Sequence, residues 1–359
     1  MNQRHAVLID GKALSADNVE IFNLRGLAPL SELIVTYKAL NTTSVPKEHP
    51  AQCISKIQVV DGSTVICDLS GKQAQALSYY HYRAPTVNGL SYIQGNYCWA
   101  ACRIPFGRWL WDPVLALDPA RFGNLQIIIT TDLDGGGAGT PTAGVLEVAA
   151  ALFDDKKIAA NGYLRNREHF RYSVVASGEM TVDLPVDNPI KLILFQGDLK
   201  DYALINQINK IKITQDNDAK IFINNNTSDI LKMLAADLPP WTEKMRGNGT
   251  TAAVEHFQTQ FYEAVAIMGG IMATPNYASC TQTDGGTVDI DSFAAGEFDV
   301  ITSGWAPHGC VGIEFGDPWD FDDWFLPGKG SELKAKLTAG AAASATGINK
   351  VITSQLVKY

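Results

Sequence analysis

Hydrophobic residues along the chain fall into many short runs, separated by glycine, proline, asparagine and aspartate. The runs are rich in β-branched and aromatic residues, which is the composition typical of strands bounded by turns. They cover residues 31–40, 54–60, 63–69, 91–104, 124–132, 144–153, 170–184, 188–198, 209–215, 219–224, 298–305, 309–315 and 347–359. The pattern therefore predicts a protein built mainly from β-strands, with its clearest hairpin turn at Asp61-Gly62.

Helical patterns are few. They cover residues 70–83, 226–238 and 251–268. Ser70 is placed to cap the first helix, and Thr227 or Ser228 to cap the second, which stops before Pro239-Pro240. Many short strands with few helices favour a sandwich or barrel over alternating β-α units.

The length of 359 residues is too great for one eight-stranded sandwich and fits two in tandem. A faint internal echo supports two: ALDPARFGNLQIIITTD (116–132) and DLPVDNPIKLILFQGD (183–198) both lead through proline into a strand and an aspartate. The polar segment 154–169 is the best boundary between the two units.

Composition narrows the possible functions. The formal net charge of −9 argues against a basic surface for nucleic acid. A hydrophobic fraction of 46% with only 19% charged residues suits a large core and extensive interfaces. No apolar run reaches the roughly 18 residues of a membrane span, and the N-terminus has no signal-peptide core, so we expect synthesis in a cytoplasm.

The cysteines do not form the dense framework of a small secreted domain. They stand at positions 53, 67, 98, 102, 280 and 310. Cys98 and Cys102 would lie on one face of one strand, about 13 Å apart, which is too far for a disulfide. We therefore predict buried free thiols.

Two loops have compositions that could suit a bound ligand. The glycine-rich stretch 130–142 lacks the Gly-Lys-Ser/Thr pattern and the following helix of a phosphate cradle, which predicts a hairpin tip. GDPWDFDDWF (316–325) combines aspartates with aromatics, so it could hold a hard cation or stack a sugar. The simpler interpretation, which we favour, is a loop anchored by its aromatics with its acids facing water or a neighbour's basic residues.

No catalytic set emerges from the sequence. His308-Gly309-Cys310 would place a base beside a nucleophile, but nothing supplies a third member or an oxyanion site. His256 has no second histidine at zinc-motif spacing. We therefore predict no catalytic residue, no cofactor and no metal ligand.

The order of three segments carries a family resemblance. They are RIPFGRWLWDPVLALDPARFGNLQIIIT (103–130), GVLEVAAALFDDKK with REHFRYSVV (144–157 and 167–175), and TVDLPVDNPIKLILFQGD (181–198). This series resembles the double jelly-roll major capsid proteins of tailless icosahedral viruses, including membrane-containing bacteriophages, a lineage shared with the adenovirus hexon.

The resemblance implies an all-β chain of two tandem eight-stranded antiparallel jelly rolls, with a few short helices in the connections. Residues 1–170 would form the first roll with an N-terminal arm, and residues 171–359 the second roll with a helical insertion around 226–268. It also implies a structural protein without an active site, assembled in the host cytoplasm into the virion capsid. Three copies would form a homotrimeric capsomer of pseudo-hexagonal outline that tiles an icosahedral shell.

The implied partners are further copies of the chain, neighbouring capsomers, and minor capsid or penton proteins. Candidate contact residues within or between subunits are Arg103, Arg108, Trp109, Trp111, Arg121, Trp319 and Trp324. The segment LRGLAPLSEL (24–33) and the C-terminal strand ending at Tyr359 would reach neighbours or an inner membrane. No direct nucleic-acid binding is expected, and an internal lipid layer between shell and genome would account for the missing basic tail.

Two rival functions remain open at this point. A virion spike or carbohydrate-binding β-sandwich would use the aromatics of 319–325 as a sugar platform. A jelly-roll hydrolase or cupin-like metalloenzyme would need clustered histidines, and His256 and His308 are isolated in sequence.

Overall fold

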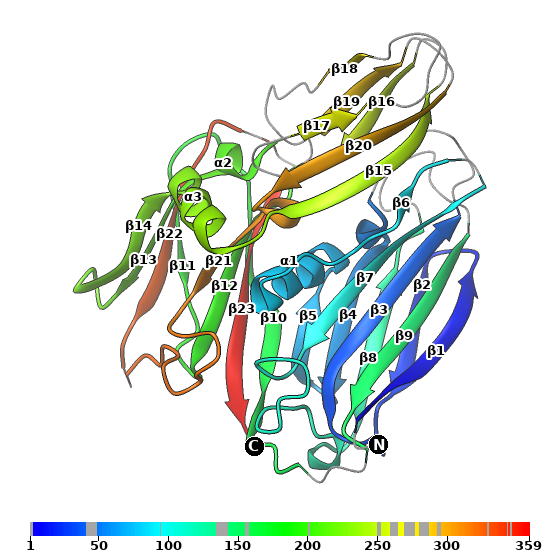
Figure 1. Cartoon of the computed structure of the whole chain (residues 1–359). Helices are drawn as coiled ribbons and strands as arrows, with labels where there is room; N and C mark the ends of the chain where they lie inside the picture. Colours follow the sequence, from blue (N-terminus) through cyan, green and yellow to red (C-terminus); the bar gives the residue numbers. More distant parts are fainter. Residues whose placement is uncertain are drawn as a thin grey trace.

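A computed structural model shows the fold of the chain. It describes residues 3–40, 49–93, 95–133, 143–154, 158–199, 202–249, 253–258, 265–268, 277–279, 287–292, 296–328, 330–342, 344 and 347–359. Strands dominate, as the sequence predicts (Figure 1).

The first half of the chain forms an antiparallel sandwich. Its strands are β1 (Arg4–Leu14), β2 (Asn18–Asn23), β3 (Leu30–Leu40), β4 (Ile54–Asp61), β5 (Thr64–Leu69), β7 (Tyr97–Pro105), β8 (Leu125–Thr131) and β9 (Gly144–Leu152). One layer has the order β1-β9-β3-β7 and the other the order β2-β8-β4-β5. The predicted hairpin at Asp61-Gly62 is confirmed, because it joins β4 to β5 with Asp61 opposite Thr64.

The second half repeats the same order. Its strands are β10 (Gly162–Ser173), β11 (Glu179–Asp183), β12 (Ile190–Gly197), β13 (Ile208–Gln215), β14 (Lys220–Asn226), β21 (Cys310–Glu314), β22 (Leu333–Ala339) and β23 (Ile348–Lys358). The layers are β10-β23-β12-β21 and β11-β22-β13-β14. Numbered within each half, both sandwiches read 1-8-3-6 and 2-7-4-5, which is the jelly-roll topology. The predicted pair of eight-stranded jelly rolls is confirmed.

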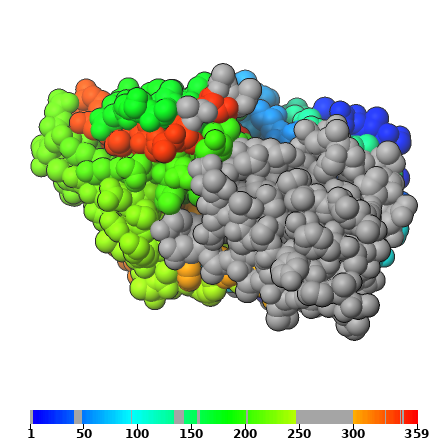
Figure 2. Space-filling model, turned by 90° about the horizontal axis from the view of Figure 1, so that it is seen from above, coloured from blue at the N-terminus to red at the C-terminus, as the bar shows by residue number. Residues whose placement is uncertain are grey.

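The two sandwiches share one sheet. Strand β5 pairs in parallel with β10, so that β2-β8-β4-β5-β10-β23-β12-β21 form a continuous eight-stranded wall. The two cores lie on opposite faces of this wall: Leu192 and Leu194 of β12 belong to the first, Ile193 and Phe195 to the second. Successive strand residues point to opposite faces, so β12 is buried along its whole length. The two sandwiches lie side by side in Figure 1, and Figure 2 shows the second half from above, in green and red, beside the visible rim of the first half in blue.

Helix α1 (Gly71–Tyr82) connects β5 to β7 and packs on the shared sheet (Figure 1). Ser70 caps it as predicted, because its hydroxyl accepts from the Gln73 amide while the Gln73 side chain accepts from the Ser70 amide. The remaining helical turns are α2 (Leu204–Gln207), α3 (Thr227–Asp237) and the 3₁₀ turns Pro50–Cys53, Pro119–Arg121 and Pro307–Gly309. None of the helices within the described residues is long and apolar enough to cross a membrane.

The start of α3 differs from the prediction. Its N-cap position is Asn226, not Thr227 or Ser228, and no side chain caps it. The Thr227 hydroxyl instead donates to the Ile208 carbonyl at 2.6 Å, which fixes the helix to β13.

A further strand layer follows α3. Its strands are β15 (Trp241–Gly249), β16 (Ala253–Gln258), β17 (Val265–Met268), β18 (Tyr277–Ser279), β19 (Thr287–Ser292) and β20 (Gly296–Gly304), with the short β6 (Leu90–Ser91) beside β15. The predicted helix at 251–268 is wrong, because β16 pairs with β19 and β17 with β20. Strand pairing overrides the helical propensity of this segment, so among the described residues of 226–268 the helix ends at Asp237. The layer lies at the end of the molecule opposite both chain termini (Figure 1).

Several connections also differ from expectation. The glycine-rich stretch, expected as a hairpin tip, lies mostly outside the described residues, at 134–142; the strands on either side, β8 and β9, belong to different layers. The two similar segments 116–132 and 183–198 contain β8 and β12. These are the seventh strand of the first sandwich and the third strand of the second, so the similarity does not mark equivalent positions in the two sandwiches. The predicted boundary at 170 falls within β10.

The chain ends are built into the sheets. Residues near the N-terminus, expected as an arm, form β1 beside β9, and Leu30–Leu40 is a central strand. The C-terminal strand β23, expected to reach a neighbour or a membrane, lies between β10 and β12. After this strand, the Tyr359 hydroxyl donates a hydrogen bond to the Ala116 carbonyl at 2.9 Å, which holds the C-terminus against the first half of the chain.

Tight packing between α1 and the shared sheet predicts sensitivity at Gly312 of β21. A Cβ there would lie 2.7 Å from the Tyr80 ring, so we expect Gly312→Ala to lower the free energy of unfolding by about 1–3 kcal/mol. Gly123→Ala, whose Cβ would meet only Asp61 at 4.0 Å, is the control and should change it by less than about 0.5 kcal/mol. Urea denaturation measures both, and equal effects would contradict this packing.

Candidate functional site

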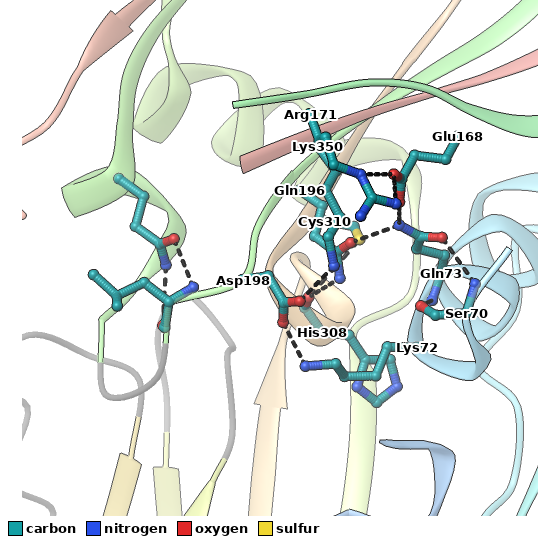
Figure 3. Close-up of polar contacts among 12 residues, drawn as sticks. Ser70, Lys72, Gln73, Glu168, Arg171, Gln196, Asp198, His308, Cys310 and Lys350 are labelled. Atoms are coloured by element: carbon teal, nitrogen blue, oxygen red, sulfur yellow. Dashed lines mark hydrogen bonds and ion pairs between the residues drawn. The ribbon is translucent and has the colours of Figure 1, made fainter. Parts of the chain in front are cut away.

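Helix α1 is the meeting point of both sandwiches and carries unusually many buried polar groups. Gln73, Gln75, Ser78 and His81 are all buried, although a helix enclosed on every side is expected to be apolar. The Gln73 amide donates to Glu168 of β10 at 2.8 Å and to Gln196 of β12 at 3.1 Å (Figure 3). This end of the helix is therefore fastened to the second sandwich.

A closed set of ion pairs surrounds that contact. Asp198, just after β12, accepts from Lys72 of α1 at 2.5 Å and from Lys350 of β23 at 2.6 Å (Figure 3). Burial acts to raise the pKa of Asp198, but the two ammonium groups hold it below its usual value. Glu168 likewise accepts from Arg171 at 2.7 Å. Each of these charged side chains has an oppositely charged partner, so the cluster fixes the sheets to α1.

A second buried network joins α1 to the strand layer 241–304. The His49 Nε2–H group donates to Glu243 of β15 at 3.0 Å, while its Nδ1 accepts from the Ala51 amide. Asn88 donates to the same carboxylate at 2.6 Å and accepts from Gln75 at 2.7 Å.

The network continues to His308 of the 3₁₀ turn before β21. Because the Gln75 amide nitrogen is used by Asn88 and the Ala101 carbonyl, its oxygen accepts from His308 Nε2 at 2.7 Å. Glu243 is 5% exposed and His308 6% exposed, so the carboxylate depends on these donors.

The environment fixes the charge of both groups. Burial lowers the pKa of His308 to about 3, so the imidazole is neutral. Burial acts to raise the pKa of Glu243, but His49, His308 and Asn88 together lower it to about 2. Burial raises the pKa of the Cys310 thiol, whose Sγ contacts the His308 carbonyl at 3.8 Å. In this arrangement the His308 imidazole is bound to Gln75 and the Cys310 thiol is protonated.

Lys191 and His81 form a third buried contact, between β12 and α1. Lys191 is 1% exposed and its Nζ lies 2.8 Å from His81 Nδ1. Burial lowers the pKa of Lys191 to about 7, and Glu314 partly offsets this effect. The amine is therefore held in a largely apolar setting beside the Trp319 and Trp324 rings, at 5.9 and 5.8 Å.

A clasp of two loops closes the end of the molecule near the chain termini. We define it as residues 105–112, which follow β7, and residues 316–325, which follow β21. Arg108 binds Asp112 through two hydrogen bonds of 2.7 and 3.0 Å and donates to the Trp319 carbonyl at 3.1 Å. Its guanidinium also lies 4.3 Å from the Trp109 ring. The anchored-loop interpretation of 316–325 agrees with this arrangement.

The structure thus brings four of the candidate contact residues together: Arg108, Trp109, Trp319 and Trp324. Trp324 is 4% exposed and packs in a small core with Leu164 and Leu356.

The other three candidates contact partners other than Arg108 and Trp319, although Trp111 belongs to the first clasp loop. Arg103 binds the buried Glu32 at 2.8 and 3.1 Å under the Tyr82 ring. Trp111 packs edge-on against Phe153. Arg121 has a 58% exposed side chain near Asp118. Their roles between subunits stay predictions.

The described part of the chain holds no group of three or more histidine, cysteine, aspartate or glutamate residues arranged to bind a metal ion. The five cysteines within it are free and buried, as predicted; Cys280 lies outside the described residues. The buried networks at Asp198 and Glu243 were missed from sequence. Polar residues inside otherwise apolar segments, such as Gln75, Lys191 and Gln196, were the available signal.

Comparisons with known proteins identify the fold. No protein-family model matches the chain. No curated protein matches its sequence. The major capsid protein of Sulfolobus Turreted Icosahedral Virus has a TM-score of 0.63 at 8% identity, covering 99% of this chain and 97% of that one. The major capsid protein of bacteriophage PM2 has a TM-score of 0.56 at 10% identity, covering 99% and 98%.

The capsid structure of the virus PBCV-1 has a TM-score of 0.52 at 10% identity, covering 99% of this chain and 94% of that one. The likeness extends over nearly the whole chain, including the second half, where the sequence resemblance stops. The chain therefore has the fold of double jelly-roll capsid proteins, and the fold that the resemblance implied is confirmed.

The neutral state of His308 predicts an acid-sensitive stability. Since its folded pKa of about 3 lies below the ordinary 6.5, the unfolded chain binds the proton first, and the free energy of unfolding falls as pH drops through this window. Burial also lowers the pKa of His81. The free energy of unfolding therefore gains a second pH dependence of the same sign. We expect His308→Gln to reduce, but not abolish, the slope between pH 6.5 and 4.5 in urea denaturation.

Glu243→Gln provides the control within the same network. The stabilisation from Glu243 is present above pH 4.5 and is lost only as the pH falls toward 2. This variant should therefore keep the pH dependence of the free energy of unfolding between pH 6.5 and 4.5. An unchanged slope in His308→Gln would show that the imidazole is not held neutral.

The clasp predicts a large difference between two arginines. Arg108→Ala leaves the fully buried Asp112 without its charged partner and should lower the free energy of unfolding by about 3–5 kcal/mol. Arg121→Ala removes an exposed, 3.7 Å pair with Asp118 and a 5.5 Å contact with the Tyr359 ring, and should cost less than about 1 kcal/mol. Similar losses in both variants, measured by thermal and urea unfolding, would contradict the assignment of Arg108 as the anchor.

Proposed function

We propose that this chain is a major capsid protein, a structural subunit without catalytic activity that builds an icosahedral viral shell. The observation that carries the proposal is the repetition of one jelly-roll topology twice in a chain, with both sandwiches fixed side by side on one sheet. The match to capsid proteins over 94–98% of their length supports it.

The geometry suits a trimer. Each subunit supplies two similar sandwiches, so a ring of three copies presents six similar units and has a pseudo-hexagonal outline. Such an outline packs without gaps into a flat facet. The ion pairs between α1, β12 and β23 hold the two sandwiches in one orientation, which a repeating lattice requires.

The buried polar groups favour a structural role over catalysis. The carboxylates of Asp198 and Glu243 are bound by donors from the same chain, and the Cys310 thiol is protonated and buried. A catalytic group would need access to a substrate, whereas Glu243 and Cys310 are enclosed and the partly buried Asp198 is bound by two ammonium groups. We therefore assign their polar chemistry to holding the fold.

The proposed partners are further copies of the chain, neighbouring capsomers, and minor capsid or penton proteins. An internal lipid layer beneath the shell is part of the same proposal, as is assembly in the host cytoplasm. The net charge of −9 supports a shell that does not itself bind the genome.

Electron microscopy of the purified protein, together with light scattering, tests the proposal. We expect trimers of the 38.9 kDa chain with a hexagonal outline, and sheets or closed particles at higher concentration. A dispersed monomer under all assembly conditions would overturn the capsid assignment. A discrete oligomer that binds glycans and never tiles would favour a spike.

A further inference from the structure

Two exposed tryptophans stand side by side on the clasp. Trp109 is 38% exposed and Trp319 39% exposed, and their ring centroids lie 6.3 Å apart with planes inclined by 55°. They come from different halves of the chain, Trp109 from the loop after β7 and Trp319 from the loop after β21. Indole rings are large apolar surfaces, so such a pair in contact with water marks a binding surface more often than an isolated apolar residue does.

The rings are held in place before anything binds. The Trp319 amide donates to Asp317 at 2.8 Å and the Trp319 carbonyl accepts from Arg108 at 3.1 Å. Trp324, buried beneath the loop, donates from its indole nitrogen to the Asp317 carbonyl at 2.9 Å. Arg108 is itself fixed to Asp112. A preorganised surface loses little conformational entropy when a partner binds.

Four aspartates in the same loop as Trp319 make this loop acidic. They are Asp317, Asp320, Asp322 and Asp323, all exposed. Within the described residues none of them forms an ion pair; their hydrogen bonds go to backbone amides of the same loop. The cation nearest the rings, Arg108, is already neutralised by Asp112. Lys191 also lies 5.9 Å from the Trp319 ring, but it is buried, so the charges that this loop exposes to solvent are negative.

We propose that the Trp109–Trp319 platform, with its four aspartates, binds lysine or arginine side chains of a basic protein segment. An ammonium or guanidinium group is attracted to the face of an indole ring, and nearby carboxylates add to the attraction. The chain already shows this preference on the inner side, where the Arg108 guanidinium lies 4.3 Å from the Trp109 ring. The exposed sides of both rings are free to accept a second cation.

Other ligands fit less well. A sugar ring gains nothing from the negative charge, and two indoles inclined by 55° do not present one flat platform. An anionic lipid surface is repelled by the four carboxylates. The platform is a property of the single chain, so this proposal stands or fails independently of the capsid assignment.

The test is fluorescence anisotropy with the full-length protein and a fluorescein-labelled oligo-arginine peptide. We expect binding that weakens as salt rises, and no binding of an oligo-glutamate peptide, a maltooligosaccharide or anionic vesicles. Trp319→Leu and the double variant Asp320→Asn, Asp322→Asn should each weaken oligo-arginine binding by about tenfold.

Matched controls separate this site from general electrostatics. Tyr97→Leu removes another exposed aromatic, on β7, and Glu179→Gln with Asp183→Asn removes two exposed acids on β11; both should bind as the unaltered protein does. Circular dichroism and thermal unfolding confirm that each variant is folded. Absence of oligo-arginine binding, or equal binding by the platform variants and the controls, would overturn the proposal. Binding of the sugar or the vesicles in its place would do the same.

Discussion

Burial of helix α1 between the two sandwiches is the constraint on which the rest of the structure depends. The helix brings polar side chains into a region without water, where an unpartnered polar group costs about 1–3 kcal/mol. Gln73 and Gln75 are therefore bound by groups from β10, β12, β7 and the turn before β21. Since these partners come from both halves of the chain, the sandwiches can satisfy the helix only in one relative arrangement.

The same constraint explains the continuous eight-stranded wall. Strand β12 faces α1 and the first core with one set of side chains and the second core with the other, so neither sandwich has a separable interior. The Asp198 ion pairs and the Glu243 network extend this coupling to β23 and to the base of the strand layer 241–304. A shell subunit benefits from such rigidity, because errors in the angle between its sandwiches would accumulate across a lattice.

Strands, turns and helix caps could be predicted from the sequence, whereas strand pairing and contacts between distant segments could not. Turn residues and β-branched runs located most strands of both sandwiches, and the Ser70 cap is a local interaction within four residues. Strand β22 was missed because its lysines alternate with small apolar residues and leave no hydrophobic run. The segment 251–268 has a helical composition but pairs with β19 and β20, and such pairing cannot be read from a local window. The polar networks were invisible for the same reason, since Gln75 and His308 are far apart in sequence.

Native-state hydrogen exchange, followed strand by strand, tests most directly whether the chain is one cooperative unit. We expect the slowest amides of β5 and β4 in the first sandwich and of β12 and β23 in the second to exchange with one common free energy of opening, through global unfolding. Arg108→Ala should lower that free energy equally in both sandwiches. Exchange of one sandwich at a clearly lower free energy, while the other stays protected, would contradict the shared sheet and the buried helix as the basis of the fold.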